Sequence, residues 1–254
     1  YLAGAVGALA GGGPALIREQ IPNLPTDQRW LLVLTIAGAA CVALTRRLSP
    51  AIDARAGRST APLHRSRKEV SRLALLFGLD AFAGGFVVST FLVFWFGRRF
   101  GASAELMGLV LFCSGLLQAL SSIASGWIAT RIGLLTTMVF THLPSNVLLI
   151  LIPVMPTLGS ATAMLLLRST LSQMDVPARQ AYVTALVDPE ERTAAAAFTN
   201  TARYVVRPLG AASAGLLMQS VAMGAPFVVA GVLKSVYDVL LFARFRQVPL
   251  PEEP

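Results

Sequence analysis

Residues 105–133 read ELMGLVLFCSGLLQALSSIASGWIATRIG, and this stretch decides the fold class. Between 105 and 130 the only charged side chain is that of Glu105, and Arg131 and Gly133 follow directly. A helix needs about 20 mostly apolar residues to cross the roughly 30 Å hydrocarbon core of a bilayer. The run is therefore long enough to cross, and glycine is a residue type at which helices end. The stretch predicts a transmembrane helix followed by a tight turn.

The composition of the whole chain agrees with this stretch. Of its 254 residues, 55% are hydrophobic and only 13% are charged, and the mean hydropathy is +0.66. Soluble domains carry about 25% charged residues, so this chain has too few to cover a soluble surface. This composition argues against soluble enzymes, nucleic-acid-binding modules and disordered chains. Because the apolar runs lack strand-like alternation, we predict an all-α integral membrane protein.

Eight apolar runs are predicted to cross the membrane as helices. Proline and glycine fall between them, where helices are expected to end. The first run is short, and the chain begins without Met, so we expect a segment cut through a hydrophobic helix. The runs are 1–17, 30–45, 73–96, 105–130, 134–152, 159–182, 193–218 and 225–243.

Lysine and arginine are distributed unevenly between alternate loops. One set of loops carries twelve of them and the other carries four, and such an excess marks the cytoplasmic side. This places the 46–72 loop, the 131–133 turn, the 183–192 loop and the C-terminus in the cytoplasm, and it accounts for the net charge of +8 without a nucleic-acid partner. The 46–72 loop is a solvated linker, a contact for anionic lipid headgroups, or both. The twelve are Arg46, Arg47, Arg55, Arg58, Arg65, Arg67, Lys68, Arg72, Arg131, Arg192, Arg244 and Arg246, and the four are Arg18, Arg29, Arg98 and Arg99.

Several ionisable side chains lie inside the apolar runs, where charge is costly and usually faces a protein or water-filled interior. Four are cations and three are carboxylates, so we expect them to pair in a shared polar interior. At a rise of 1.5 Å per residue, Asp80, His142, Asp175 and Arg203 fall in one layer of the cytoplasmic half. Such a layer could bind a proton or an ion, or latch the inward gate. The cations are Arg168, Arg203, Arg207 and Lys234, the carboxylates are Asp80, Asp175 and Asp238, and His142 is a neutral companion.

Residues four apart share a helix face, which predicts how two further sets of charges behave. Arg203 and Arg207 repel each other and therefore need acidic partners or an anionic ligand. Lys234 and Asp238 are expected to neutralise each other within one helix.

Prolines at depth are expected to kink helices and to serve as hinges. These prolines are Pro14, Pro144, Pro177 and Pro208.

The order of two helices, a long basic loop and six helices resembles helices 5 to 12 of a major facilitator superfamily permease. The turn Gly126-Trp-Ile-Ala-Thr-Arg-Ile-Gly133 is similar to the family's Gly-x-x-x-Asp-Arg-x-Gly loop between helices 8 and 9. Thr130 stands at the aspartate position, where its hydroxyl could cap a helix. The segments that resemble a bacterial subfamily of unsettled substrate are 78–85, 140–146, 172–180 and 188–192.

The resemblance implies a division of the chain and a mechanism. Residues 1–48 would be the last two helices of a truncated N-terminal bundle, and 49–72 a basic cytoplasmic linker. Residues 73–246 would form a complete six-helix C-terminal bundle, and 247–254 a cytoplasmic tail. The implied mechanism is rocker-switch alternating access around a central cavity. The expected partners are a small-molecule substrate and the lipid bilayer, and we expect a monomer in the bacterial inner membrane.

The candidate site residues fall into three groups, and no catalytic or metal-binding residue is among them. The cavity or coupling candidates are Asp80, His142, Asn146, Arg168, Asp175, Arg203 and Arg207. The cytoplasmic loop motif comprises Gly126, Thr130, Arg131 and Gly133. The cytoplasmic gate candidates are Asp175, Arg179, Glu191 and Arg192.

The sequence therefore predicts a secondary active transporter of a small solute, and not an enzyme. No cofactor is expected, and a proton gradient coupled through Asp80, with His142 or Asp175, is the expected energy source. The Gly13-Pro14 pair is similar to the Gly-Pro element of antiporters and favours efflux of an amphiphile or drug.

Other classes are weighed against this interpretation. The only lysines, Lys68 and Lys234, do not follow a phosphate-binding glycine loop, which excludes an ATP-driven pump. The two histidines, His64 and His142, form no His-Glu-x-x-His motif, which argues against a metalloenzyme. A membrane aspartyl hydrolase using Asp80 and Asp175 stays open, although no catalytic motif supports it. Two further alternatives stay open. One is uptake of an organic anion by the arginines of the cavity, and the other is a non-transporting scaffold or receptor with the same fold.

Overall fold

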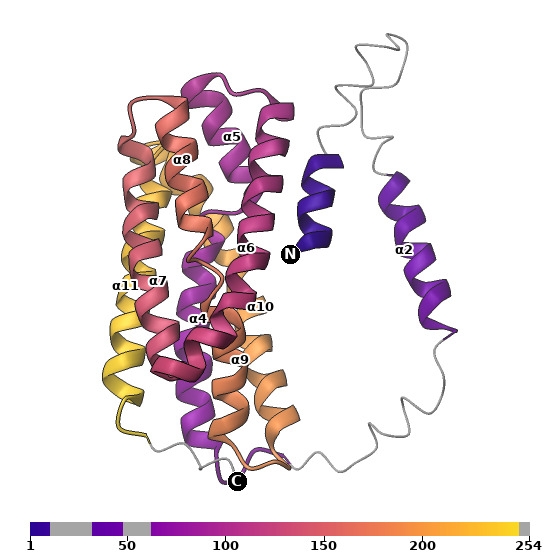
Figure 1. The fold of residues 1–254 in the computed structure, drawn as a ribbon, viewed down its shortest axis with the longest axis vertical. Coiled ribbons are helices and arrows are strands. Elements are labelled where there is room, and N and C mark those ends of the chain that lie inside the picture. The colour runs from indigo at the N-terminus through magenta and orange to yellow at the C-terminus, as the bar shows by residue number, and fades with distance from the viewer. Residues whose placement is uncertain (11–31, 48–61, 249–254) are drawn as a thin grey trace.

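The computed structural model describes residues 1–10, 32–47 and 62–248 (Figure 1). Within these ranges the secondary structure is helical and contains no strand, as the all-α prediction requires. Parts of the predicted spans 1–17 and 30–45 and most of the predicted linker lie outside the described residues. The helices are residues 2–10, α2 (Leu32–Thr45), α4 (Arg67–Gly85), α5 (Ser89–Phe100), α6 (Ala104–Ile132), α7 (Leu134–Leu151), η2 (Ile152–Val154), α8 (Leu158–Ser169), α9 (Asp175–Leu186), α10 (Arg192–Ser220) and α11 (Ala225–Phe245).

Four helical stretches of the described residues are long and apolar enough to cross a bilayer. They correspond to four of the eight predicted spans, and the count of eight stays a prediction. Helix α10 has sufficient length at 29 residues, but three arginines lower its hydropathy. The four stretches are Arg67–Phe100, Ala104–Ile132, Leu134–Val154 and Ala225–Phe245.

Two of the predicted spans consist of two helices each. The run 73–96 folds as α4 and α5, and the run 159–182 folds as α8 and α9 with residues 170–174 between them. In contrast, α7 and α10 continue through Pro144 and Pro208, where kinks are expected from the sequence. A proline removes one backbone hydrogen bond, which neighbouring helices can compensate. At the end of α8, the Thr170 hydroxyl donates a hydrogen bond to the Leu167 carbonyl oxygen at 2.7 Å. Such a side-chain bond competes with the backbone hydrogen bonds of a continuing helix.

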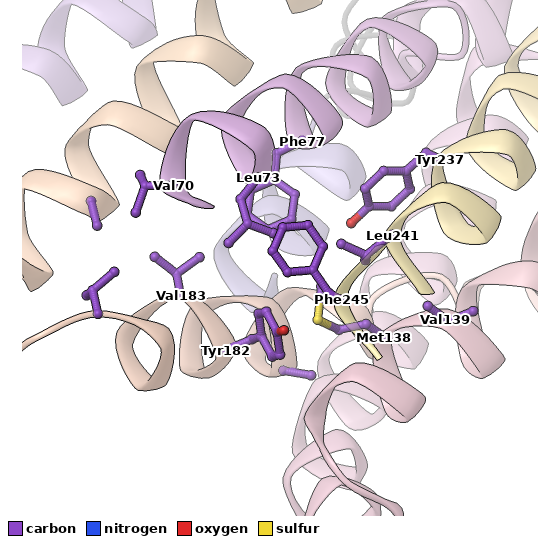
Figure 2. Packing of buried hydrophobic residues seen from close by; sticks show 13 residues of the cluster. Val70, Leu73, Phe77, Met138, Val139, Tyr182, Val183, Tyr237, Leu241 and Phe245 are labelled. Carbon is purple, nitrogen blue, oxygen red and sulfur yellow. The ribbon is translucent and has the colours of Figure 1, made fainter. Parts of the chain in front are cut away.

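The bundle contains two large apolar clusters, one toward each end. The first cluster includes Phe77, Tyr182 and Phe245 (Figure 2) and joins the starts of α4 and α7 to the ends of α9 and α11. The helix ends that border the predicted cytoplasmic loops therefore meet at one end of the bundle. The second cluster includes Trp95 and Phe227, whose rings lie edge to face with centroids 4.9 Å apart.

Two glycines allow α4 and α10 to pack with their backbones in contact. A Cβ atom on Gly85 would collide with the carbonyl oxygen of Arg207, and one on Gly210 would collide with that of Phe82. Small residues permit such close approach between helices in membranes. The contact brings the charged faces of α4 and α10 together in the middle of the bundle.

The two helices that precede the bundle differ in their contacts. In the 2–10 helix, Ala5 is buried and lies against Gly115 of α6. The Tyr1 hydroxyl also donates a hydrogen bond to Gln173 Oε1 at 2.6 Å. Helix α2, in contrast, has no buried residue. Its apolar side chains are exposed on every side, which suits contact with lipid or with further helices.

Candidate functional site

A polar cavity of about 510 Å³ lies inside the bundle. Every helix from α4 to α11 contributes to its walls, together with Tyr1. All but one of the predicted cavity candidates line it, and the exception is Asn146, which lies behind the wall. The lining residues that carry charge or an imidazole are Asp80, His142, Arg168, Asp175, Arg179, Arg203, Arg207 and Lys234.

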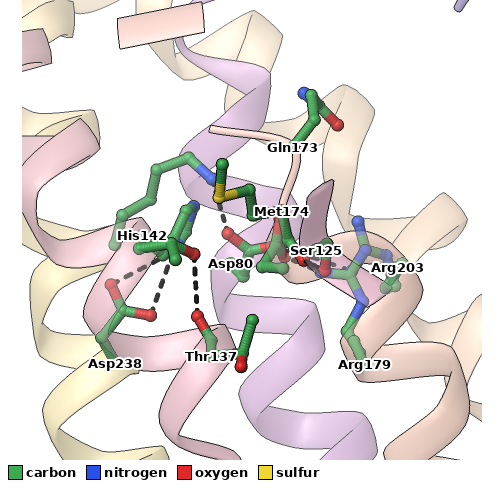
Figure 3. Close-up of polar contacts among 12 residues, drawn as sticks. Asp80, Ser125, Thr137, His142, Gln173, Met174, Arg179, Arg203 and Asp238 are labelled. Atoms are coloured by element: carbon green, nitrogen blue, oxygen red, sulfur yellow. Dashed lines mark hydrogen bonds and ion pairs between the residues drawn. The ribbon is translucent and has the colours of Figure 1, made fainter. Parts of the chain in front are cut away.

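Asp80 of α4 is the centre of an ion-pair network in this wall. Its carboxylate lies 2.5 Å from Lys234 Nζ, 3.5 Å from Arg179 Nη1 and 3.5 Å from Arg203 Nη1. Arg179 also contacts the Asp175 carboxylate at 2.7 Å, one turn earlier in α9. Figure 3 shows Asp80 between His142 on one side and the two arginines on the other. Three helices therefore place charged groups around one buried carboxylate of α4, which is how charge is accommodated within a membrane.

Asp238 of α11 forms a second, separate cluster. Its carboxylate contacts His142 Nδ1 at 3.0 Å and accepts a hydrogen bond from Asn146 Nδ2 at 2.8 Å. The predicted neutralisation of Lys234 by Asp238 is therefore wrong. Because α11 packs against α4 on one side and α7 on the other, Lys234 reaches across to Asp80 while Asp238 turns to α7.

Arg168 and Arg207 line the cavity without an ion pair to any other described residue. The Nε atom of Arg168 is buried and has no hydrogen-bond partner among the described residues. Two buried hydroxyls of the cavity wall, those of Ser114 and Ser172, also lack a partner there. In the part of the chain that the structure describes, no three His, Cys, Asp or Glu side chains gather as metal ligands.

The comparisons with known proteins fit this arrangement. The family model of the Major Facilitator Superfamily matches residues 73–254. The chain belongs to the major facilitator superfamily. An uncharacterized membrane protein of Saccharomyces cerevisiae is 26% identical over 175 residues, which are 68% of this chain and 39% of that protein. The chain thus spans about two fifths of the length of this relative. No solved structure matches the chain.

Membership of the superfamily confirms the resemblance to its permeases. The predicted loop motif lies at the turn from α6 to α7. Gly133 adopts a φ of +86° there, a backbone conformation that favours glycine. The Arg131 guanidinium lies 4.1 Å from the Trp127 ring centroid. The Thr130 hydroxyl donates to the Trp127 carbonyl oxygen within α6 at 2.8 Å, so it does not act as the expected cap.

The gate candidates of this superfamily member lie in two places. Asp175 and Arg179 belong to the cavity wall, whereas Glu191 and Arg192 lie at the start of α10. The buried Glu191 carboxylate accepts hydrogen bonds from the backbone N–H groups of residues 64–66 at 2.8, 3.0 and 3.1 Å. These bonds, the one from residue 64 foremost, lower the pKa of Glu191 to about 2. Glu191 therefore fastens the residues that lead into α4 to the turn that precedes α10.

Three kinds of group in the cavity are not predicted from the sequence. The first is Lys234, for which the helical spacing predicts Asp238 as partner instead of Asp80. Lys234 lies eleven residues from the end of α11, and this depth places it in the predicted charged layer with Asp80. The buried hydroxyls of Ser114 and Ser172 give no sequence signal, because serine is common in membrane helices. Tyr1 reaches the wall from outside the bundle, which no local pattern indicates.

Proposed function

We propose that this chain provides the C-terminal six-helix bundle, residues 73–246, of a permease that moves a small solute by alternating access. Residues 1–48 would belong to the preceding bundle and 49–72 would link the two. The observation that carries the proposal is the cavity whose walls hold a buried ionic network from α4, α9, α10 and α11. Buried charge is costly, and within membranes it usually marks a substrate or ion pathway.

Proton coupling through Asp80 is the proposed source of energy. Asp80 lines the cavity and is shared by three cations. A proton on its carboxylate would release Lys234 and Arg203, which come from two different helices. Protonation would thereby change how α4 is held against α10 and α11, and a conformational change between inward-open and outward-open states needs such a switch. His142 and Asp175 line the same cavity and are the proposed partners in proton transfer.

The direction and the location of transport follow the sequence. We propose efflux by a monomer in a bacterial inner membrane, with the C-terminus in the cytoplasm. Support for the orientation comes from the basic loops, whose flanking helix ends share the first apolar cluster. Support for efflux comes from the Gly13-Pro14 pair, which lies outside the described residues.

The test uses the full-length protein in inside-out vesicles with an imposed pH gradient. Movement of ethidium and of benzoate is followed in the wild type and in Asp80→Asn. We expect transport to be lost and the pH gradient no longer to be consumed, because the switch has lost its titratable group. Asp188→Asn is the control, since this carboxylate is half exposed and does not line the cavity.

Two results would contradict the proposal. Transport that persists unchanged in Asp80→Asn at every gradient tested would remove proton coupling through this residue. A protein that moves neither probe, and whose cellular role survives neutralisation of Asp80 and Arg203 together, would be a scaffold or receptor instead.

A further inference from the structure

The described walls of the cavity carry more positive than negative charge. Five cationic side chains line it against the two carboxylates of Asp80 and Asp175. Both carboxylates already contact cations, Asp80 through three contacts and Asp175 through Arg179. Arg179 and Lys234 are buried, Arg168 and Arg203 are half-buried, and Arg207 is exposed. Unpaired positive charge within a membrane is unfavourable unless a negative group offsets it. Arg168 and Arg207 are the two cations left to receive such a group.

Arg168 lies beside a break in a membrane helix. It occupies the last turn of α8, and the chain then leaves the helix until α9 begins at Asp175. The backbone of the break is satisfied locally, because the N–H groups of Leu171 and Ser172 donate to the Arg168 carbonyl oxygen at 3.1 and 2.9 Å. The guanidinium takes no part in these bonds. Discontinuous helices of this kind form substrate sites in secondary transporters.

Unpartnered hydroxyls lie at the same depth as this guanidinium. The side chains of Ser114 and Ser172 line the cavity, are 4% and 5% exposed, and have no hydrogen-bond partner among the described residues. Ser114 and Arg168 each lie ten residues beyond the first residue of their helices, which is about 15 Å along the axis. Because α6 packs against α8 and both helices begin at the same end of the bundle, these groups share one level of the wall.

An apolar wall adjoins these polar groups. It consists of aliphatic side chains from α5 to α8 and from the turn before α5, several of which belong to the second apolar cluster. A ligand held by its charged end would therefore find a dry surface for its remainder. The volume of about 510 Å³ lies within the range of small-molecule sites. The aliphatic lining residues are Val87, Val88, Leu92, Leu111, Leu149 and Leu165.

We infer that this cavity binds an amphiphilic organic anion, whose anionic group lies against Arg168 and the hydroxyls of Ser114 and Ser172. Arg207 supplies the second positive charge, and the apolar part of the ligand lies along the aliphatic wall. The inference rests on the proposed transport function and names its substrate class. It selects an anion over the cationic drugs that efflux alone would allow.

The first experiment measures binding to the full-length protein in lipid nanodiscs by titration calorimetry. Benzoate, benzyl alcohol and benzylamine are the probes, because they share a ring and differ in charge. We expect benzoate to bind about tenfold or more tightly than benzyl alcohol, since a hydrogen bond to a charged group contributes on the order of a tenfold to hundredfold affinity. Benzylamine should bind most weakly of the three.

Variants then assign the preference to the site. Arg168→Gln should weaken benzoate binding about tenfold or more and leave benzyl alcohol binding unchanged, which also reports that the cavity is intact. Arg168→Lys should keep part of the preference, because it keeps the charge. Arg98→Gln is the control, since Arg98 is exposed at the end of α5 and does not line the cavity. If Arg168→Gln does not fold, Arg207→Gln and Ser172→Ala provide the same comparison with smaller losses.

Two outcomes would overturn the inference. One is benzylamine binding as tightly as benzoate, and the other is benzoate affinity that changes equally in Arg168→Gln and Arg98→Gln. Failure of the proposed function gives a different result. Benzoate would then bind through Arg168 but would not move across vesicle membranes. Proton-coupled movement of ethidium without movement of benzoate would contradict the anion inference and would support the proposed transporter.

Discussion

Asp80 and Asp238 are both buried aspartates of one helical bundle, yet their surroundings differ. Asp80 lines the cavity and lies within 3.5 Å of three cations from α9, α10 and α11. Asp238 is fully buried, does not line the cavity, and contacts His142 and Asn146 of α7. The same side chain thus serves as a shared counter-ion in one place and as a fixed hydrogen-bond acceptor in the other.

The comparison shows what makes a buried carboxylate suited to transport. Several cations compete for Asp80, so removing one contact leaves others and alternative pairings are available. Asp238 has no second set of partners among the described residues, and its contacts hold α11 against α7. The cavity reaches the first carboxylate directly, whereas the second contacts the cavity wall only through His142.

The largest effect on stability is expected for Asp80→Asn. Loss of this charge leaves Lys234, Arg179 and Arg203 with only Asp175 to share, and breaking a buried pair costs about 3–5 kcal/mol. The free energy of unfolding, measured by denaturant titration in detergent, should fall by this amount. In the double variant Asp80→Asn/Lys234→Met, part of the loss should return, because one unpaired cation is removed. A double variant no more stable than Asp80→Asn would mean that Lys234 is not the principal partner.

The next largest loss of stability is expected for alanine at two glycines, Gly85 on the Asp80 side of the bundle and Gly231 on the Asp238 side. Gly85→Ala places a methyl group against the backbone of α10, which cannot move aside, so about 3 kcal/mol of stability should be lost. Gly231→Ala meets the flexible Ile150 side chain and the Asn146 carbonyl oxygen, and about 1–2 kcal/mol is expected. Gly85→Ala should also impair transport, since it displaces the Asp80 side of the bundle. Equal losses of transport in the two variants would argue that the two sides move together.

The sequence predicts the bundle well where apolar runs are long. The runs 105–130, 134–152, 193–218 and 225–243 agree with α6, α7, α10 and α11 to within a few residues. The break between α8 and α9 is not predicted, because neither proline nor glycine occurs in residues 170–174.

For the candidate site, the sequence predicts which charged residues lie in the interior but not which partner each one contacts. Charges in apolar runs predict that Asp80, Asp175 and Arg203 share a polar interior, since an unpaired charge facing lipid is costly. The partner of each charge depends on which neighbour a helix face meets. Lys234 and Asp238 share a face by spacing and yet contact different helices, so spacing alone gives the wrong pair.

A smaller effect is expected for Asp238→Asn. The asparagine keeps one oxygen for Asn146 but presents an amide to one of its two neighbours, so about 1–2 kcal/mol should be lost. Transport should fall much less than in Asp80→Asn, because Asp238 does not itself line the cavity and contacts its wall only through His142. Unfolding and vesicle assays on the same preparation check both statements. Loss of transport with unchanged stability would make Asp238 part of the coupling path and would erase the contrast with Asp80.

The smallest effect concerns a third carboxylate, Glu191, which contacts backbone N–H groups instead of side-chain cations. These N–H groups lower its pKa from an ordinary 4.5 to about 2. A lowered pKa means that the stabilisation is complete above 4.5 and is lost as the pH falls through about 2. The melting temperature of the wild type should therefore decline across this window, while Glu191→Gln should be less stable at neutral pH and should lack that part of the decline. Asp188→Asn is the control, because Asp188 is half exposed and its contact with Arg65 is long at 3.7 Å. Identical pH profiles for the wild type and Glu191→Gln would show that the amide groups before α4 do not hold this carboxylate in solution.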